Sequence, residues 1–185
     1  MRKILIILLL SLTCFSLSAS DPYDISLFFS PSVSWGTGRA DFSSLENGIS
    51  ARAGANFGLS RRWEMSAGAT SSLIPVPFEK TNFFLEFSVS LLGDRTTESR
   101  VSGSPFNIMM SLGGLCALDF SSGKYVAAGP YVSVTPFVIG NPLTGRRERL
   151  LKTDMGYDAL NNRFFLVFSL ISLDYYVRGS YRDYF

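Results

Sequence analysis

The chain has 185 residues, of which 46% are hydrophobic, 14% aromatic and only 17% charged. The charged share lies below the roughly 25% of an average soluble domain, and the length suits a single domain. The apolar content excludes a disordered chain, and the net charge of +2 argues against a nucleic-acid binder. Histidine is absent, which excludes an imidazole base and histidine metal sites, and we expect no metal or other cofactor.

Residues 1–20 are predicted to form a cleaved signal peptide, followed by one mature domain over 21–185. Two basic residues precede a short apolar run, and Ser18-Ala19-Ser20 offers a small-residue cleavage site. The apolar run is shorter than the ~20 residues that a membrane-spanning helix needs. Lipidation at Cys14 is a less favoured alternative. With the leader removed, one cysteine remains, which excludes a disulfide framework.

Alternation of apolar and polar residues with a period of two repeats along the mature chain and predicts β-strands. In the first segment, 23–35, the odd positions are apolar and Phe28 is the exception. The predicted strands are about 23–35, 51–59, 63–70, 83–91, 106–120, 125–138, 147–160 and 163–185. The apolar phase is odd in the first four strands, even in the next two and odd in the seventh. Turn residues separate them, so the pattern predicts an antiparallel meander of about eight strands, with ten as an alternative.

Three local details refine this prediction. A turn at 60–62 pairs Leu59 with Trp63, which keeps both on one face. In the sixth strand, one face is predicted to carry Val126, Val132, Val134 and Val138, and the opposite face Tyr125, Tyr131, Ser133 and Thr135. The prolines at 130 and 136 lack an N–H for the ladder, so they require a bulge or a place at the rim. In the last strand, a turn at Asn161-Asn162 directs Phe164, Leu166 and Phe168 outward, with a bulge near Asp174 restoring the odd phase.

The polar phase indicates which face lies inside. It is dominated by Ser, Gly, Asn and Thr, whereas a solvated sheet face usually carries many Lys and Glu, and this chain has only four lysines. Small polar residues suit the narrow lumen of an eight-stranded barrel. Trp35 and Trp63 lie at strand ends on the apolar phase, as in an aromatic girdle. We therefore expect a membrane-facing apolar surface. The alternative is a soluble, lipocalin-like periplasmic barrel that binds a lipid or other apolar ligand in an apolar interior.

These features resemble small outer-membrane β-barrels of the OmpX/OmpW type. The last strand is similar to the signal read by the barrel-assembly machinery, with Phe185 as the terminal aromatic and Tyr181, Gly179 and Val177 at alternate positions before it. The resemblance implies an eight-stranded, up-and-down transmembrane barrel in the outer membrane. Its implied partners are outer-membrane lipid, the assembly machinery and periplasmic chaperones, and its implied state is a monomer.

The polar phase also supplies candidate lumenal charges. We predict a lumenal polar network of Arg52, Glu64, Glu86, Lys152, Asp154 and Asp158, with Asp24, Asp119, Arg178 and Arg182 as further members. Buried charges must be paired, so the mixed signs favour a filled lumen over an open pore. A selective path along the carboxylates is the alternative. Lumenal apolar residues are predicted at Phe28, Phe84, Met109 and Leu115.

The predicted role is non-enzymatic, because the many serines have no accompanying base. The expected function is structural or surface contact, or a narrow conduit for small or hydrophobic solutes. Arginines at 61–62, 95, 100 and 146–149 are expected at the end that holds the termini, as a solvated rim or, alternatively, a site for anionic headgroups or an acidic partner. The opposite connections, 36–48 and 75–81, are the candidate contact loops.

Overall fold

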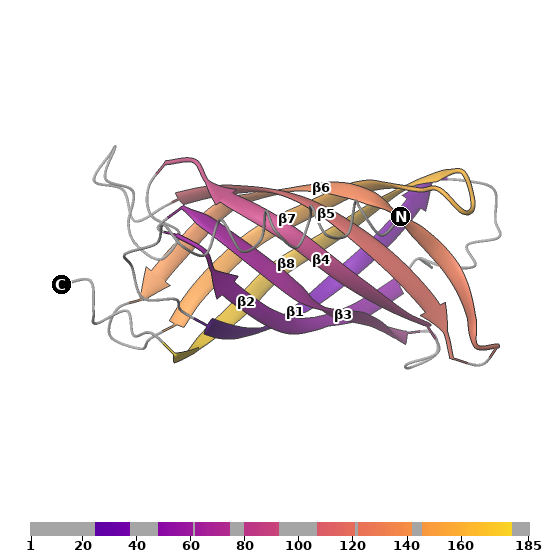
Figure 1. The fold of residues 1–185 in the computed structure, drawn as a ribbon, viewed down its shortest axis with the longest axis horizontal. Helices are drawn as coiled ribbons and strands as arrows, with labels where there is room; N and C mark the ends of the chain where they lie inside the picture. The colour runs from indigo at the N-terminus through magenta and orange to yellow at the C-terminus, as the bar shows by residue number, and fades with distance from the viewer. Residues whose placement is uncertain are drawn as a thin grey trace, which may run out of the picture.

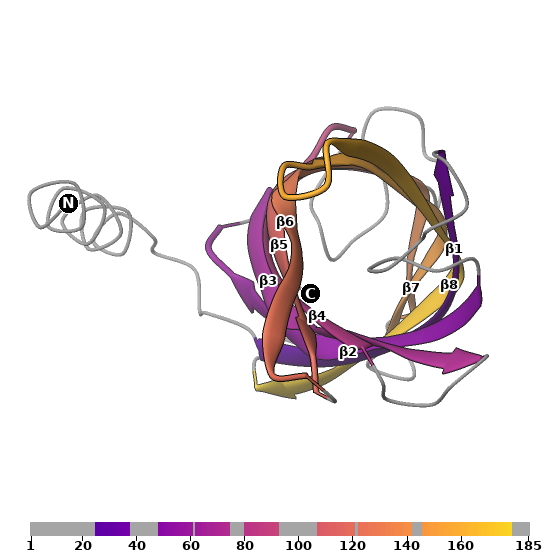
Figure 2. The ribbon, with the colours of Figure 1, turned by 90° about the vertical axis from the view of Figure 1, so that its right-hand side faces the viewer.

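The computed structural model describes residues 25–37, 48–60, 62–74, 80–92, 107–120, 122–141 and 146–178. They form eight antiparallel strands that close into one barrel (Figure 1), with β1 paired to both β2 and β8. The strands are β1 (Ile25–Thr37), β2 (Gly48–Gly58), β3 (Trp63–Ile74), β4 (Lys80–Ser90), β5 (Asn107–Asp119), β6 (Lys124–Asn141), β7 (Arg146–Asp158) and β8 (Arg163–Arg178). Viewed along the axis, they make a complete ring with no sheet edge (Figure 2).

The predicted meander of eight strands is confirmed, and each strand pairs with its neighbour in sequence. The predicted register between the second and third strands is also correct, since Phe57 pairs with Met65 and Gly58 with Glu64. Because the strands alternate in direction, the barrel has two ends. We call the end where β1 begins and β8 finishes the terminal end, and the opposite one the far end.

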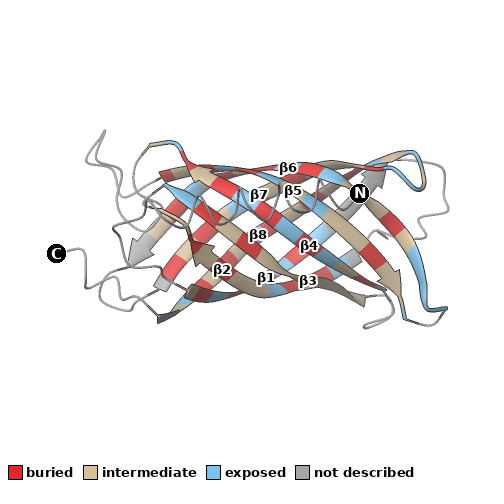
Figure 3. Ribbon diagram, viewed as in Figure 1, coloured by how far each residue is buried: buried red, intermediate tan, exposed pale blue. Residues whose placement is uncertain are grey.

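Alternation of burial along the strands separates an inner from an outer face. In β4, Phe84, Glu86 and Ser88 are buried, whereas Phe83, Leu85 and Phe87 are exposed. Buried segments alternate with exposed or intermediate ones along the strands (Figure 3). The polar phase thus faces the lumen and the apolar phase faces outward, as predicted for the membrane type of barrel. No helix among the described residues is long and apolar enough to cross a membrane.

Glycines on the inner face make room for aromatic rings. One row of paired residues across β1–β4 reads Phe28, Gly54, Gly68 and Phe84, and the two rings meet over the glycines at 6.1 Å between centroids. A Cβ atom on Gly68 would lie 2.2 Å from the carbonyl oxygen of Ala53. Only glycine therefore fits this row without moving the backbone.

A line of ladder irregularities crosses β5 to β1 and changes which residues face inward. Successive inward residues are three positions apart instead of two at Thr135 and Val138 in β6, Arg149 and Lys152 in β7, and Ser169 and Ser172 in β8. Leu151, between the two β7 residues, has a φ of 58°. Each extra residue acts as a β-bulge that reverses the inward phase.

These irregularities correct three predictions. The predicted bulge that restores the odd outward phase in the last strand is present, but it lies at Leu170–Ile171, before Asp174, and Phe164 points outward as expected. In the sixth strand, a register shift opposite Asn107–Met109 absorbs Pro136 and turns Val138 inward. A second shift, opposite Ala117–Leu118, leaves Tyr125 on the outer face, 70% exposed. Both shifts reverse the faces that unbroken alternation had assigned.

Candidate functional site

The lumen holds a first group of side chains, four of them charged, which we call the central cluster: Arg52, Glu86, Tyr131, Lys152 and Asp154. Arg52 donates through Nη2 to Glu86 at 2.8 Å and through Nη1 to Asp154 at 2.5 Å. Lys152 Nζ donates to both oxygens of Glu86, at 2.7 and 2.6 Å. The Tyr131 hydroxyl donates to Glu86 at 2.9 Å. Glu86 therefore forms ion pairs with two cations that reach it from β2 and β7.

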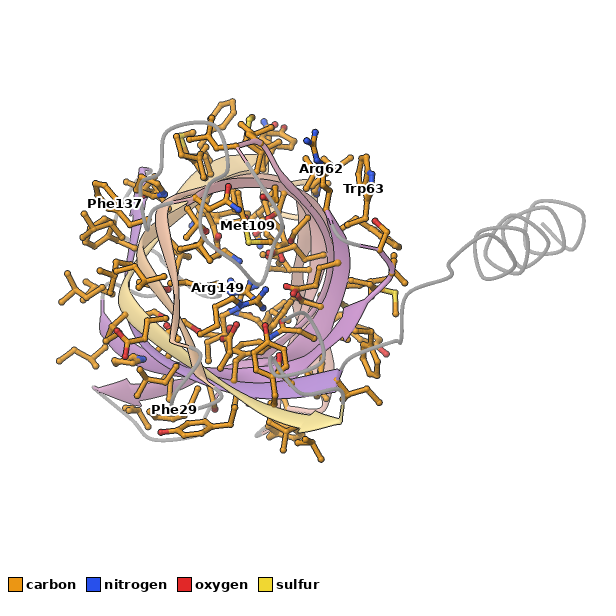
Figure 4. All side chains as sticks on the ribbon, turned by 90° about the vertical axis from the view of Figure 1, so that its left-hand side faces the viewer. Phe29, Arg62, Trp63, Met109, Phe137 and Arg149 are labelled. Atoms are coloured by element: carbon orange, nitrogen blue, oxygen red, sulfur yellow. The ribbon has the colours of Figure 1, made fainter. Side chains whose placement is uncertain are left out.

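A second group, the terminal cluster, consists of Glu64, Arg147, Arg149 and Asp174. Arg147 lies 2.7 Å from both Glu64 and Asp174, and Arg149 lies 2.6 Å from Glu64 and 2.9 Å from Asp174. Each arginine thus bridges the same two carboxylates, which come from opposite parts of the ring in β3 and β8. Seen from the terminal end, Arg149 projects into the lumen, whereas Phe29, Trp63 and Phe137 lie outside the wall (Figure 4).

Both clusters are charge-balanced. Each contains two cations and two carboxylates, and all eight charged residues are buried. Removal of a charge from water costs several kcal/mol per ion, so the cations and carboxylates must pair to stay inside. The result is a set of cross-lumen ties that fills the barrel with side chains.

The structure places five of the six residues of the predicted network in these clusters: Arg52, Glu64, Glu86, Lys152 and Asp154. Asp158 does not join them. It accepts hydrogen bonds from the backbone N–H of Ala128 at 3.2 Å and of Leu160 at 3.1 Å, and so ties the β7–β8 turn to β6. Asp119 is half-buried in the β5–β6 turn, where it accepts a hydrogen bond from Ser122.

The predicted network omitted Arg147, Arg149, Asp174 and Tyr131, although alternation had put Tyr131 on the polar face. The rim predicted for the arginines at 146–149 is wrong for Arg147 and Arg149, which are 0% and 5% exposed inside the lumen. The β7 bulge turns them inward. One signal was available in the sequence. Glu64 was predicted to lie in the lumen without an assigned cation, and the arginines could have supplied its positive partner. Asp24 and Arg182 lie outside the described residues, as do residues 1–20, Gly179, Tyr181 and Phe185, and the side chain of Arg178 is not described.

An apolar layer borders the central cluster. It consists of Phe28, Phe84, Tyr131, Phe165 and Val167, with Leu115 packed against it. The guanidinium of Arg52 lies over the Phe84 ring, 3.8 Å from its centroid. The predicted lumenal positions of Phe28, Phe84 and Met109 are correct, since all three are buried.

A small cavity separates the two clusters. Arg52, Glu86 and Lys152 line it from the central cluster and Arg149 from the terminal cluster, and small polar residues of the wall complete it: Ser30, Asn56, Ser66, Ser169 and Ser172, together with Phe28. It has room for roughly one water-sized particle. A drug-sized ligand needs a pocket of about 300–1,000 Å³, so this cavity suits only a very small guest.

No group of His, Cys, Asp or Glu side chains within the described strands and turns is arranged to hold a metal ion.

The outer face is apolar along the strands. Its exposed residues include Phe29, Leu85, Leu112, Val132 and Leu170, and Trp63 is 53% exposed at the terminal end. The strands have 11 to 18 residues, enough for the 9–11 residues with which a tilted strand crosses a bilayer. The apolar interior expected of a soluble lipid-binding barrel is contradicted by the buried charges. The fold is that of a small transmembrane β-barrel.

Comparison with known proteins adds likenesses of fold. No family model matches the sequence, and no curated protein matches it. One similar solved structure is the N-terminal β-barrel domain of Pseudomonas aeruginosa OprF, at 8% identity and a TM-score of 0.43, over 81% of this chain and 97% of that one. Another is Ail, the attachment invasion locus protein of Yersinia pestis, at 12% identity and a TM-score of 0.33, over 82% and 96% of the two chains. At these identities, neither likeness identifies a functional residue.

Proposed function

We propose that the chain is an integral outer-membrane β-barrel that acts as a structural or surface-contact protein, without catalysis and without an open pore. The observation that carries the proposal is the inverted distribution of side chains, with eight charged residues of the two clusters buried inside and apolar residues exposed outside. In water, such an outer face would be an aggregation surface, whereas a bilayer buries it.

The packing of the lumen supports a closed barrel over a narrow conduit. Two ion-pair clusters tie opposite strands together, and the Phe28–Phe84 layer adjoins the central one. The cavity between the clusters has room for roughly one water-sized particle. A solute larger than water would have to break several buried ion pairs to pass. The surfaces that remain for function are the loops at the two ends and the lipid-facing wall.

Location and assembly belong to the same proposal. Barrels of this kind require export and insertion, for which the sequence offers the expected signal peptide over 1–20 and the terminal Phe185. The proposed partners are outer-membrane lipid, the barrel-assembly machinery and periplasmic chaperones. The two clusters offer no catalytic base, because each carboxylate is engaged with cations.

The test is refolding of residues 21–185 into detergent, followed by gel electrophoresis with and without boiling. We expect the unboiled and boiled samples to migrate at different positions on the gel, because the folded barrel resists the gel detergent until it is boiled. We also expect β-type circular dichroism only when detergent is present. Folding in plain buffer with no shift would contradict the membrane barrel. Conductance in planar bilayers tests the closed lumen, and steady pore-like currents would contradict that part alone.

A further inference from the structure

The cavity between the two clusters carries an excess of positive charge on its walls. Three cations line it, Arg52, Lys152 and Arg149, against a single carboxylate, Glu86. The other three carboxylates of the clusters do not line the cavity. Since Coulomb energy falls with distance, the nearest charges contribute most to the potential inside the cavity, and we expect it to be positive although each cluster as a whole is neutral.

Hydrogen-bond donors on these walls also outnumber their partners. Arg149 donates through Nε to Asp174 and through Nη2 to Glu64, and its Nη1 has no hydrogen-bond partner within the part of the chain that the structure describes. Asn56 donates one of its two amide hydrogens to the Ser26 hydroxyl oxygen, and the other hydrogen remains available within the described strands. Arg52 donates through Nη1 and Nη2, and its Nε–H has no acceptor among the described residues.

The carboxylate and amide oxygens on the walls already accept hydrogen bonds. Both oxygens of Glu86 accept from Lys152, and one of them also accepts from Arg52 and Tyr131. The Asn56 amide oxygen accepts from Ser66. The occupant that fits these walls best accepts several hydrogen bonds from the unused N–H donors and favours a positive potential. A water molecule accepts only two, whereas a halide accepts several from all directions.

From this geometry we infer that the cavity is a binding site for one small monovalent anion of halide size, held by Arg149, Lys152 and Arg52. The small volume excludes phosphate and organic carboxylates, because there is room for roughly one water-sized particle. The anion sits between the two ion-pair clusters and joins them, so its binding stabilises the folded barrel. The inference concerns the lumen alone and does not depend on which surface role the barrel performs.

Two measurements on the refolded barrel in detergent test the site. Crystals soaked in sodium bromide should give an anomalous bromine peak beside Arg149. In solution, the midpoint of urea unfolding should rise with sodium chloride or bromide and saturate, relative to sodium gluconate at equal ionic strength. At a chloride concentration ten times the dissociation constant, the folded-to-unfolded ratio rises about 11-fold.

A matched pair of variants separates the site from general screening by salt. Arg147→Gln removes ion pairs to Glu64 and Asp174, as Arg149→Gln does, but Arg147 does not line the cavity. We expect the halide effect to be lost in R149Q and kept in R147Q. If R149Q does not refold, Arg149→Lys retains the charge without Nη1 and should weaken the halide effect.

Three outcomes would overturn the inference. One is the absence of an anomalous peak together with equal stability in all three salts, which would assign water to the cavity. Another is equal loss of the halide effect in R147Q and R149Q. The third is a bromine peak only on the outer surface. Each of these leaves the heat-dependent gel shift of the barrel unaffected, so failure here is distinguishable from failure of the proposed function.

Discussion

Replacement of Glu86 by glutamine removes the carboxylate that holds the central cluster together. Glu86 is fully buried and lies 2.8 Å from Arg52 and 2.6 Å from Lys152. In the variant, Lys152 keeps only Asp154 as a charged partner, at 3.6 Å, and the cluster gains a net charge of about +1. Loss of one partner from a buried ion pair costs about 3–5 kcal/mol, because the other charge stays buried without compensation. We expect a loss of unfolding free energy near the lower value, since the glutamine amide oxygen still accepts one hydrogen bond.

The double variant Glu86→Gln, Lys152→Met restores neutrality with a side chain of similar length. Replacement of a buried ion pair by apolar groups is often nearly neutral, so the double variant should be more stable than E86Q alone by about 2 kcal/mol or more. The assay is urea unfolding in lipid vesicles, followed by tryptophan fluorescence. The single variants Glu86→Gln and Lys152→Met are measured beside the double variant. If their effects on the unfolding free energy add to within about 0.5 kcal/mol, or if E86Q is as stable as the wild type, Glu86 and Lys152 are not coupled as a buried ion pair.

Two further substitutions probe the wall of the barrel. Gly68→Ala places a Cβ 2.2 Å from the Ala53 carbonyl oxygen and should lower the unfolding free energy by about 1–3 kcal/mol in the same urea assay. The control Gly114→Ala should be neutral, because the nearest neighbour of its Cβ would lie at 3.9 Å. Equal effects of the two variants would refute the role of the glycine row. Leu112→Arg, at an outward position that is 62% exposed, should cost about 2–4 kcal/mol in vesicles, whereas Tyr125→Arg, beside the β5–β6 turn at the far end, should cost about 0–1 kcal/mol. A Leu112→Arg variant that is fully stable in vesicles would contradict a lipid-facing position.

Periodicity in the sequence was enough to predict the strands and most of their faces. In β4, Glu86 and Ser88 indicate the inward side from the sequence, and burial alternates from Phe83 to Ser88 even though Phe84 is an apolar residue on the inner face. The terminal halves of β6, β7 and β8 do not follow in this way. A bulge inserts one residue and reverses every later side chain, and its position depends on the partner strand as well as on the strand itself. Pro136 signalled an irregularity, but its effect on Val138 was visible only from the pairing with β5.

The same cause explains the incomplete prediction of the lumenal site. Lys152 and Asp154 lie on the regular side of the β7 bulge and could be assigned to the lumen from alternation. Arg147 and Arg149 lie beyond Leu151, whose positive φ no sequence pattern indicated. The ion-pair partners could not be predicted either, because Arg52 and Asp154 are 102 residues apart in sequence and come into contact only when the barrel closes.

Nitroxide labels at neighbouring positions of the barrel in vesicles distinguish a polar lumen within a lipid-facing apolar wall from the opposite arrangement. In a Cys116→Ala background, labels would be placed at Leu112 and Val132 on the outer face and at Ser111 and Ser133 on the inner face. Accessibility to oxygen dissolved in the bilayer is then measured by electron paramagnetic resonance. We expect high accessibility at Leu112 and Val132 and low accessibility at Ser111 and Ser133. The reverse order, or equal accessibility at all four positions, would contradict a polar lumen within a lipid-facing wall.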